Sequence, residues 1–285
     1  MRTAYRNAFL LVLASILLLQ SCTRIGLAYR HLDRLIPWSV SDYLDMTPEQ
    51  RSTFDSQLRE QLSWHCRTQL PGYLAWMDRV HAMVAERRVS EPEVRARLAE
   101  AKQAVATVAE EITPSTVEML RGLNDEQVEE LAASFADDRR ERKEKYLDVP
   151  LQEQVDERVE RMQKRLETWM GRLSPAQQER VRQWSASLGA QNQAWLENRA
   201  HWQDALLAAL EQRDSEQFAG RIQVLLQQRE TLWTDAYRQA FATTEQAGVD
   251  LFVDLMASAS DTQRATLLKR GAALREDFAG IECQD

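Results

Sequence analysis

The chain has 285 residues, a formal net charge of −8 and a mean hydropathy of −0.50. This length suffices for one large domain or two small ones, and the negative charge disfavours binding to the phosphate backbone of nucleic acids. Only nine glycines and seven prolines interrupt a composition rich in Ala, Leu, Glu, Gln and Arg, which predicts long helices.

Residues 1–21 have the layout of a secretory signal peptide. Two arginines precede an apolar run from Ala8 to Leu19, and Leu19-Gln20-Ser21-Cys22 resembles the lipobox of bacterial lipoproteins. The resemblance implies cleavage before Cys22 and lipid attachment to its thiol, so that residues 22–285 remain. The alternative, a permanent transmembrane anchor, is short of length, because the apolar run has about a dozen residues and a spanning helix needs about 20.

Acyl chains on Cys22 would hold the protein on a lipid bilayer, which is therefore its first expected partner. Thr23 follows the cysteine. By resemblance to enterobacterial lipoproteins, the absence of Asp there favours the periplasmic face of the outer membrane, with the inner membrane as the alternative. No Gly/Ser-rich tether separates Cys22 from the apolar segment Leu27 to Trp38, so we expect residues 22–45 to stay close to the membrane.

Residues 46–285 are expected to form an all-α periplasmic body, an elongated, curved bundle of long antiparallel helices without a β-sheet. No stretch alternates apolar and polar residues for long enough to predict a strand. The body is either one unit or two packed halves, about 46–149 and 150–285. Prolines are interpreted as helix boundaries: Pro37 ends the membrane-proximal segment, Pro114 falls near a helix start, and Pro71 breaks or sharply kinks a helical stretch.

A capping motif recurs at four predicted helix starts. The four motifs are Thr47-Pro48-Glu49-Gln50, Asn124-Asp125-Glu126-Gln127, Ser174-Pro175-Ala176-Gln177 and, more weakly, Ser260-Asp261-Thr262-Gln263. In each, the first side chain can accept a hydrogen bond from the first helical turn while the Gln reaches back to the cap backbone. Ordinary capping explains all four, although pairs at 47 and 124 and at 174 and 260 hint at two related halves.

Tryptophan is the unusual residue, with eight in the chain. Leu188, Trp195 and Trp202 are spaced by seven on a helix predicted from Pro175 to about Gln212. The favoured interpretation is the buried seam of a long hairpin, whose second helix runs from about Asp214 to Gln246. The alternative is a half-open groove for apolar polypeptide or lipid, whose lining residues are Trp184, Gln191, Trp195, Asn198 and Trp202.

Cys66 and Cys283 are the only thiols left if Cys22 carries lipid. Because the periplasm oxidises pairs of cysteines, we predict a disulfide between them that closes a loop of more than 200 residues. The alternative is two free thiols, one buried at position 66 and one in a frayed C-terminus at position 283.

No pattern in the sequence indicates catalysis or metal binding. The four histidines are His31, His65, His81 and His201. They are scattered and lack an HExxH motif or paired cysteines, so we expect no metal site and no cofactor. A nucleophile elbow, a phosphate-binding glycine loop and a dinucleotide fingerprint are also absent from the sequence.

Two resemblances to known families rest on these motifs. The capped helix starts resemble the LTxxQ motif of periplasmic stress proteins of the Spy/CpxP type. Over nearly the whole mature chain the sequence resembles a family of proteobacterial lipoproteins to which no activity is assigned. The segments that carry this second resemblance are Leu27-Ala28-Tyr29-Arg30 with Leu32-Asp33-Arg34-Leu35-Ile36-Pro37-Trp38, Asp42-Tyr43 before Met46-Thr47-Pro48-Glu49-Gln50, Trp64-His65 with Leu70-Pro71 and Tyr73, and Glu167-Thr168-Trp169 before Gly171-Arg172-Leu173. This second resemblance implies a lipid-anchored location and a helical fold, and it implies no active site.

We therefore expect a lipid-anchored envelope protein that acts by binding, as a chaperone-like module for unfolded polypeptides or another apolar client. One alternative is a structural subunit or assembly partner of an envelope complex. An enzyme such as a hydrolase is the least favoured alternative, because no catalytic constellation supports it.

Overall fold

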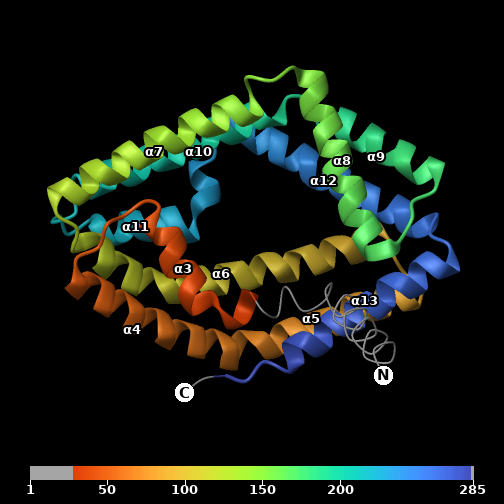
Figure 1. Ribbon diagram of the computed structural model, residues 1–285, viewed down its shortest axis with the longest axis horizontal. Helices are drawn as coiled ribbons and strands as arrows, with labels where there is room; N and C mark the ends of the chain where they lie inside the picture. The colour runs from red at the N-terminus through yellow and green to blue at the C-terminus, as the bar shows by residue number, and fades with distance from the viewer. Residues whose placement is uncertain (1–27, 284–285) are drawn as a thin grey trace, which may run out of the picture.

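The computed structural model describes residues 28–283, which contain eleven α-helices and no strand, so the predicted all-α class is confirmed. The helices are α3 (Leu32–Ser41), α4 (Pro48–Trp64), α5 (Leu70–Ala85), α6 (Glu91–Arg121), α7 (Asp125–Tyr146), α8 (Leu151–Met170), α9 (Pro175–Ser187), α10 (Gln191–Leu210), α11 (Phe218–Gln227), α12 (Asp235–Ala257) and α13 (Asp261–Ala279). A π-helical turn, η1 (His65–Gln69), joins α4 to α5, and a 3₁₀ turn, η2 (Arg229–Leu232), precedes α12. Figure 1 shows the helices following the outline of an elongated body.

The buried apolar side chains gather in two clusters, one toward each end of that body. The first core lies where α4 and α7 begin and contains Leu44, Met46, Leu120, Leu123, Leu131, Phe135, Leu206, Ala209, Leu210, Phe218, Ile222 and Leu225. The second core lies where α9 and α13 begin and contains Met83, Val84, Val94, Met170, Val181, Trp184, Leu188, Val249, Leu251, Leu255 and Met256.

These cores do not divide the chain near residue 150, as two independently packed halves would. The end of α5 contributes Met83 and Val84 to the second core, and the start of α6 contributes Val94. The rest of this core is built from residues 170–256. In the same way, the end of α10 and helix α11 contribute half of the first core. Each half of the chain therefore sends a helical hairpin into the core of the other half.

Ion pairs accompany this exchange at both ends. Arg213, at the tip of the second hairpin, pairs with Asp125 at the start of α7. Arg87, at the tip of the first hairpin, pairs with Asp261 at the start of α13. Both acidic residues directly follow a cap residue of one of the four motifs, so the two ends of the molecule are built alike.

All four capping boxes form, and their glutamines also pair with one another. The amides of Gln50 and Gln127 donate to each other at 3.1 and 2.7 Å. The amides of Gln177 and Gln263 do the same at 3.1 and 2.8 Å. The motifs at 47 and 124, and those at 174 and 260, thus meet in space as two reciprocal amide pairs, one at each core.

The prediction of one continuous tryptophan-bearing helix from Pro175 to about Gln212 is wrong, because two helices occupy this range. The chain leaves the helical path at Leu188–Ala190, where Gly189 has a positive φ of 51°, and this separates α9 from α10. The guanidinium of buried Arg158 donates to the carbonyls of Ser185 and Gly189, which satisfies backbone groups that the interrupted helix leaves open. The predicted partner helix from Asp214 to Gln246 is likewise divided, into α11, η2 and α12.

The proline interpretation needs three corrections. Pro37 and Pro114 lie inside α3 and α6 and end neither helix. Pro71 does not break the helix either, because the chain stays helical from Pro48 to Ala85 through η1. In this π-helical turn the Leu70 N–H donates to the carbonyl of His65, five residues back. Pro71 then lies in the first turn of α5, where a proline is tolerated.

Candidate functional site

The largest apolar concavity that we describe lies between α5 and α6, which we call the α5–α6 groove. The two helices follow one another in the chain, yet α5 packs chiefly against α13 and α6 chiefly against α11. One apolar stripe of α6 is therefore left without a helix on top of it, and Val105 in this stripe is 53% exposed. The groove has a volume of about 750 Å³, within the range of small-molecule sites.

Small and aliphatic side chains of α6 form one wall, namely Ala101, Ala104, Val105, Val108, Ala109 and Ile112. Their spacing of three and four residues places them on one helix face. Trp76 and Met77 of α5 stand opposite, and Phe278 of α13 completes one end. Between its two ends the groove is therefore lined by apolar side chains.

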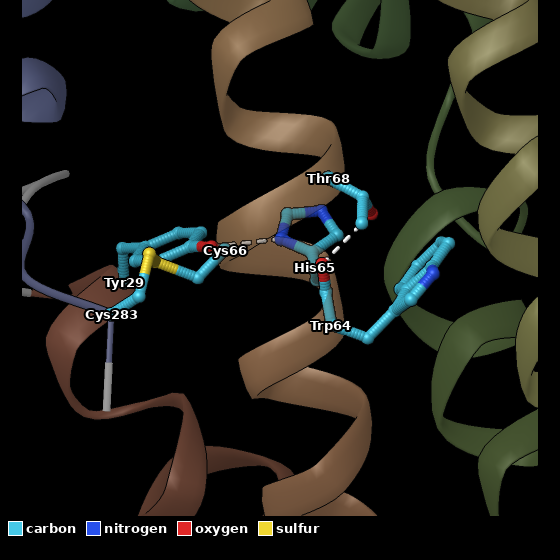
Figure 2. Close-up of a disulfide and its surroundings, with 6 residues drawn as sticks. All are labelled: Tyr29, Trp64, His65, Cys66, Thr68 and Cys283. Atoms are coloured by element: carbon cyan, nitrogen blue, oxygen red, sulfur yellow. Dashed lines mark hydrogen bonds between the residues drawn. A yellow bond between two sulfur atoms is a disulfide. The ribbon is translucent and has the colours of Figure 1, made fainter. Parts of the chain in front are cut away.

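One end of the groove holds three hydrogen-bonded rings. The hydroxyl of Tyr29 lies 2.8 Å from Nδ1 of His65, and Nε2 of His65 lies 3.0 Å from the hydroxyl of Tyr73. Figure 2 shows the Tyr29 hydroxyl pointing at the His65 ring from beside the disulfide. The N-terminal segment, η1 and α5 thus each supply one member of this trio.

The protonation state of the trio follows from burial. Burial lowers the pKa of the His65 imidazole and raises the pKa of the Tyr29 and Tyr73 hydroxyls. A neutral imidazole has one N–H, so it accepts from one tyrosine and donates to the other. The tyrosine that accepts keeps its own O–H, which makes one donor available to a ligand at this end of the groove.

Stability should depend on pH through His65. Because its folded pKa lies below the unfolded value of about 6.5, the unfolded state binds the proton first as pH falls. We expect the contribution of His65 to be fully present above that unfolded value and to decline as pH falls toward the folded pKa, by at most about 1.4 kcal/mol per pH unit. His65→Gln keeps donor and acceptor groups without titrating. Urea unfolding from about pH 7.5 to 5 should show the wild type losing its advantage over this variant, whereas parallel curves would contradict the assignment.

A disulfide closes the same end of the groove. Cys66 follows His65 in η1 and is bonded to Cys283, with an S–S distance of 2.03 Å and a Cα–Cα distance of 5.5 Å (Figure 2). The guanidinium of Arg30 also donates to the carbonyl of Gly280 at 3.0 Å. The predicted pairing of Cys66 with Cys283 is thus present in the structure, and it fixes the C-terminal segment beside the trio.

The other end of the groove is polar. Glu100 of α6 pairs with Arg79 of α5 at 2.9 Å and with Arg97 at 3.1 Å. The indole N–H of Trp76 donates to the carbonyl of Arg97 at 3.0 Å. The groove is therefore an apolar channel with a hydrogen-bonding trio at one end and an ion pair at the other.

The predicted tryptophan groove is only partly assembled. Trp184 is buried in the second core, and Gln191 accepts a hydrogen bond from Thr244. Trp195, Asn198 and Trp202 do line a common pocket of about 310 Å³ between α10, η2 and α12. Its further aromatic residues are Trp233, Tyr237 and Phe241.

The polar groups of Asn198 and Trp202 in this pocket form hydrogen bonds within the protein. Asn198 accepts from the backbone N–H of Thr234, and the indole N–H of Trp202 donates to the carbonyl of Leu225. The ring of Trp195 packs against Tyr146 and lies under the guanidinium of Arg142. These contacts give the two tryptophans the role of a seam between helices, with a small opening beside it.

The remaining features to compare with the structure are the lipidated cysteine, a metal site and a membrane-spanning helix. Cys22 and the signal segment lie outside the described residues. Within residues 28–283, no group of three or more His, Cys, Asp or Glu side chains gathers as a metal site. None of the helices in this range combines the length and the apolar character that a bilayer crossing requires.

Sequence reasoning missed the α5–α6 groove. Tyr29, His65 and Tyr73 all stand in segments that carry the family resemblance. Their spacing of eight residues across a π-helical turn, and of 36 residues to Tyr29, leaves no local periodicity that would join them. The apolar stripe of α6 was visible in the sequence, but such a stripe ordinarily predicts burial.

The comparison with known proteins gives a family. The chain matches DUF6279, described as a family of unknown function, over residues 42–238. This range contains His65, Tyr73 and the whole α6 wall of the groove. No curated protein and no solved structure matches the chain. Since the family match covers more than half of its length, the chain belongs to the DUF6279 family of unknown function.

Proposed function

We propose that this protein is a lipid-anchored envelope protein without enzymatic activity, and that it binds a lipid acyl chain in the α5–α6 groove. The anchor is the acylated Cys22, and the location is the periplasmic face of the outer membrane, with the inner membrane as the alternative. The observation that carries the binding activity is the uncovered apolar stripe of α6, which ends at the Tyr29–His65–Tyr73 trio.

The chemistry of the groove wall favours an acyl chain over an extended polypeptide. A polypeptide carries an N–H and a C=O group at nearly every residue, and each needs a partner when it is buried. The α6 wall consists of Ala, Val and Ile side chains, which offer no such partner, and the polar lining residues Thr68 and Gln69 belong to η1, beside the trio. An acyl chain needs none along its length, and its polar head can accept a hydrogen bond from the free tyrosine hydroxyl of the trio.

Blocking the groove should abolish this binding. Ala104 faces the groove from the middle of α6, so Ala104→Trp places a ring where the acyl chain would lie. We expect the affinity for a long-chain fatty acid carrying an environment-sensitive fluorophore to fall at least about tenfold, which corresponds to about 1.4 kcal/mol. Fluorescence titration of the purified protein measures this change.

The matched control is Gln103→Trp, which adds the same ring at an exposed position of α6 outside the groove. It should bind as the wild type does. Equal affinity of the Ala104→Trp and wild-type proteins would exclude the groove as the site. Capture of a reduced, unfolded model polypeptide without any binding of the fatty acid would instead support a chaperone-like activity.

A further inference from the structure

Helix α3 is apolar on two sides. Leu32, Leu35, Ile36 and Val40 line an apolar pocket of about 530 Å³ beside the first core. Leu35, at the rim of this pocket, is 40% exposed, and Trp38 on the outward side is 66% exposed. None of the residues of α3 is fully buried. Two large apolar side chains exposed within one helical turn form an apolar patch, and such patches are typical of interaction sites.

The outward face has a regular composition. His31, Arg34, Leu35 and Trp38 are all exposed, and their spacing of three, four and seven residues places them along one side of the helix. This stripe contains one basic and two large apolar side chains, together with a histidine, and it ends at the exposed acidic C-cap residue Asp42. Apolar side chains beside an arginine suit the boundary between phospholipid headgroups and acyl chains, where indole rings are also enriched.

The position of α3 in the chain identifies the occupant. Leu32 is only ten residues past Cys22. Ten residues reach at most about 36 Å when the chain is fully extended and about 17 Å when it is flexible. If Cys22 carries the anchoring lipid, the helix cannot move far from the bilayer surface. We propose that α3 lies on this surface and inserts Leu35 and Trp38 among the lipids, which sets the orientation of the whole body. This inference rests on the anchor of the proposed function.

The test uses the full lipidated protein in vesicles of phosphatidylethanolamine and phosphatidylglycerol whose acyl chains carry bromine. Bromine quenches only indoles that reach the lipid. An acyl chain in the α5–α6 groove would also quench Trp76, so we expect the wild type to lose more tryptophan emission than the Trp38→Phe protein, and the difference between the two reports Trp38. The matched control is Trp169→Phe, which removes an indole that packs against the second core, and it should be quenched as the wild type is.

Mass spectrometry of the same samples separates the anchor from the docking helix. Acyl mass on Cys22 with no quenching specific to Trp38 overturns the docking of α3 and leaves the anchor intact. Quenching specific to Trp38 without acyl mass supports the docking and overturns the anchor. Failure of the protein to bind vesicles overturns both. A detergent-solubilised dimer that Trp38→Phe dissociates would assign the face to a second copy of the chain and overturn the lipid contact.

Discussion

Replacing Cys66 and Cys283 together by alanine should lower the free energy of unfolding by about 5 kcal/mol at 25 °C on the chain-entropy model. The two residues are 217 positions apart, so the disulfide removes a large part of the freedom of the unfolded chain. Alanine is the suitable replacement because Cys66 is buried, where a serine hydroxyl would need a new partner. Urea unfolding monitored by circular dichroism measures the difference.

Two controls identify the disulfide as the cause. The wild type unfolded in the presence of a reductant should match the double alanine variant, since both lack the bond. Each single alanine variant should lose nearly as much stability as the double variant, because either change breaks the same bond. A double variant as stable as the oxidised wild type, or two thiols that react with a labelling reagent in the unreduced wild type, would show that the bond is not formed.

Replacing Gln177 by alanine should destabilise the protein by about 2–4 kcal/mol. This side chain is 2% exposed and both caps α9 and pairs with Gln263. Losing the capping-box bond costs about 1 kcal/mol, and leaving one buried N–H of the Gln263 amide without its acceptor costs about 1–3 kcal/mol more. The other N–H of that amide still donates to the carbonyl of Arg172. Urea unfolding of the Gln177→Ala protein measures the sum.

A double-mutant cycle tests the pairing itself. Because the two amides satisfy each other, the protein that carries both Gln177→Ala and Gln263→Ala should lose clearly less than the two single losses together. Gln223→Ala is the control, since Gln223 is an exposed helical residue that bonds only Gln227, and it should change stability by no more than about 0.5 kcal/mol. Additive losses in the double variant would mean that the two glutamines act only as separate caps.

The helices and their starts could be predicted because their causes are local. Thr47, Asn124, Ser174 and Ser260 each cap the helix that follows them, as the motif requires. A capping box uses the amide oxygen of its glutamine and leaves the amide N–H₂ group without a local partner. The sequence does not contain the position of a partner 77 or 86 residues away, so the pairing of the glutamines was not predictable from the motif.

The prediction that the tryptophans share one face of a single helix was wrong for a related reason. The spacing of Leu188, Trp195 and Trp202 by seven defines one face only if the helix between them is unbroken. Gly189 interrupts it, and the structure sends Leu188 into the second core while Trp202 packs against the first. The uncovered apolar stripe of α6 could not be predicted either, because periodicity identifies a helix face and does not state whether another helix covers it.

The exchange of hairpins between the two cores is the arrangement of a domain-swapped dimer whose chains have been joined. Two separate half-length chains with these motifs would have to meet in solution before either core was complete, so their folding would depend on protein concentration. The link Leu147–Pro150 between α7 and α8 holds both halves in one molecule. It thereby makes their association intramolecular, at an effective concentration that two separate chains in dilute solution would not reach.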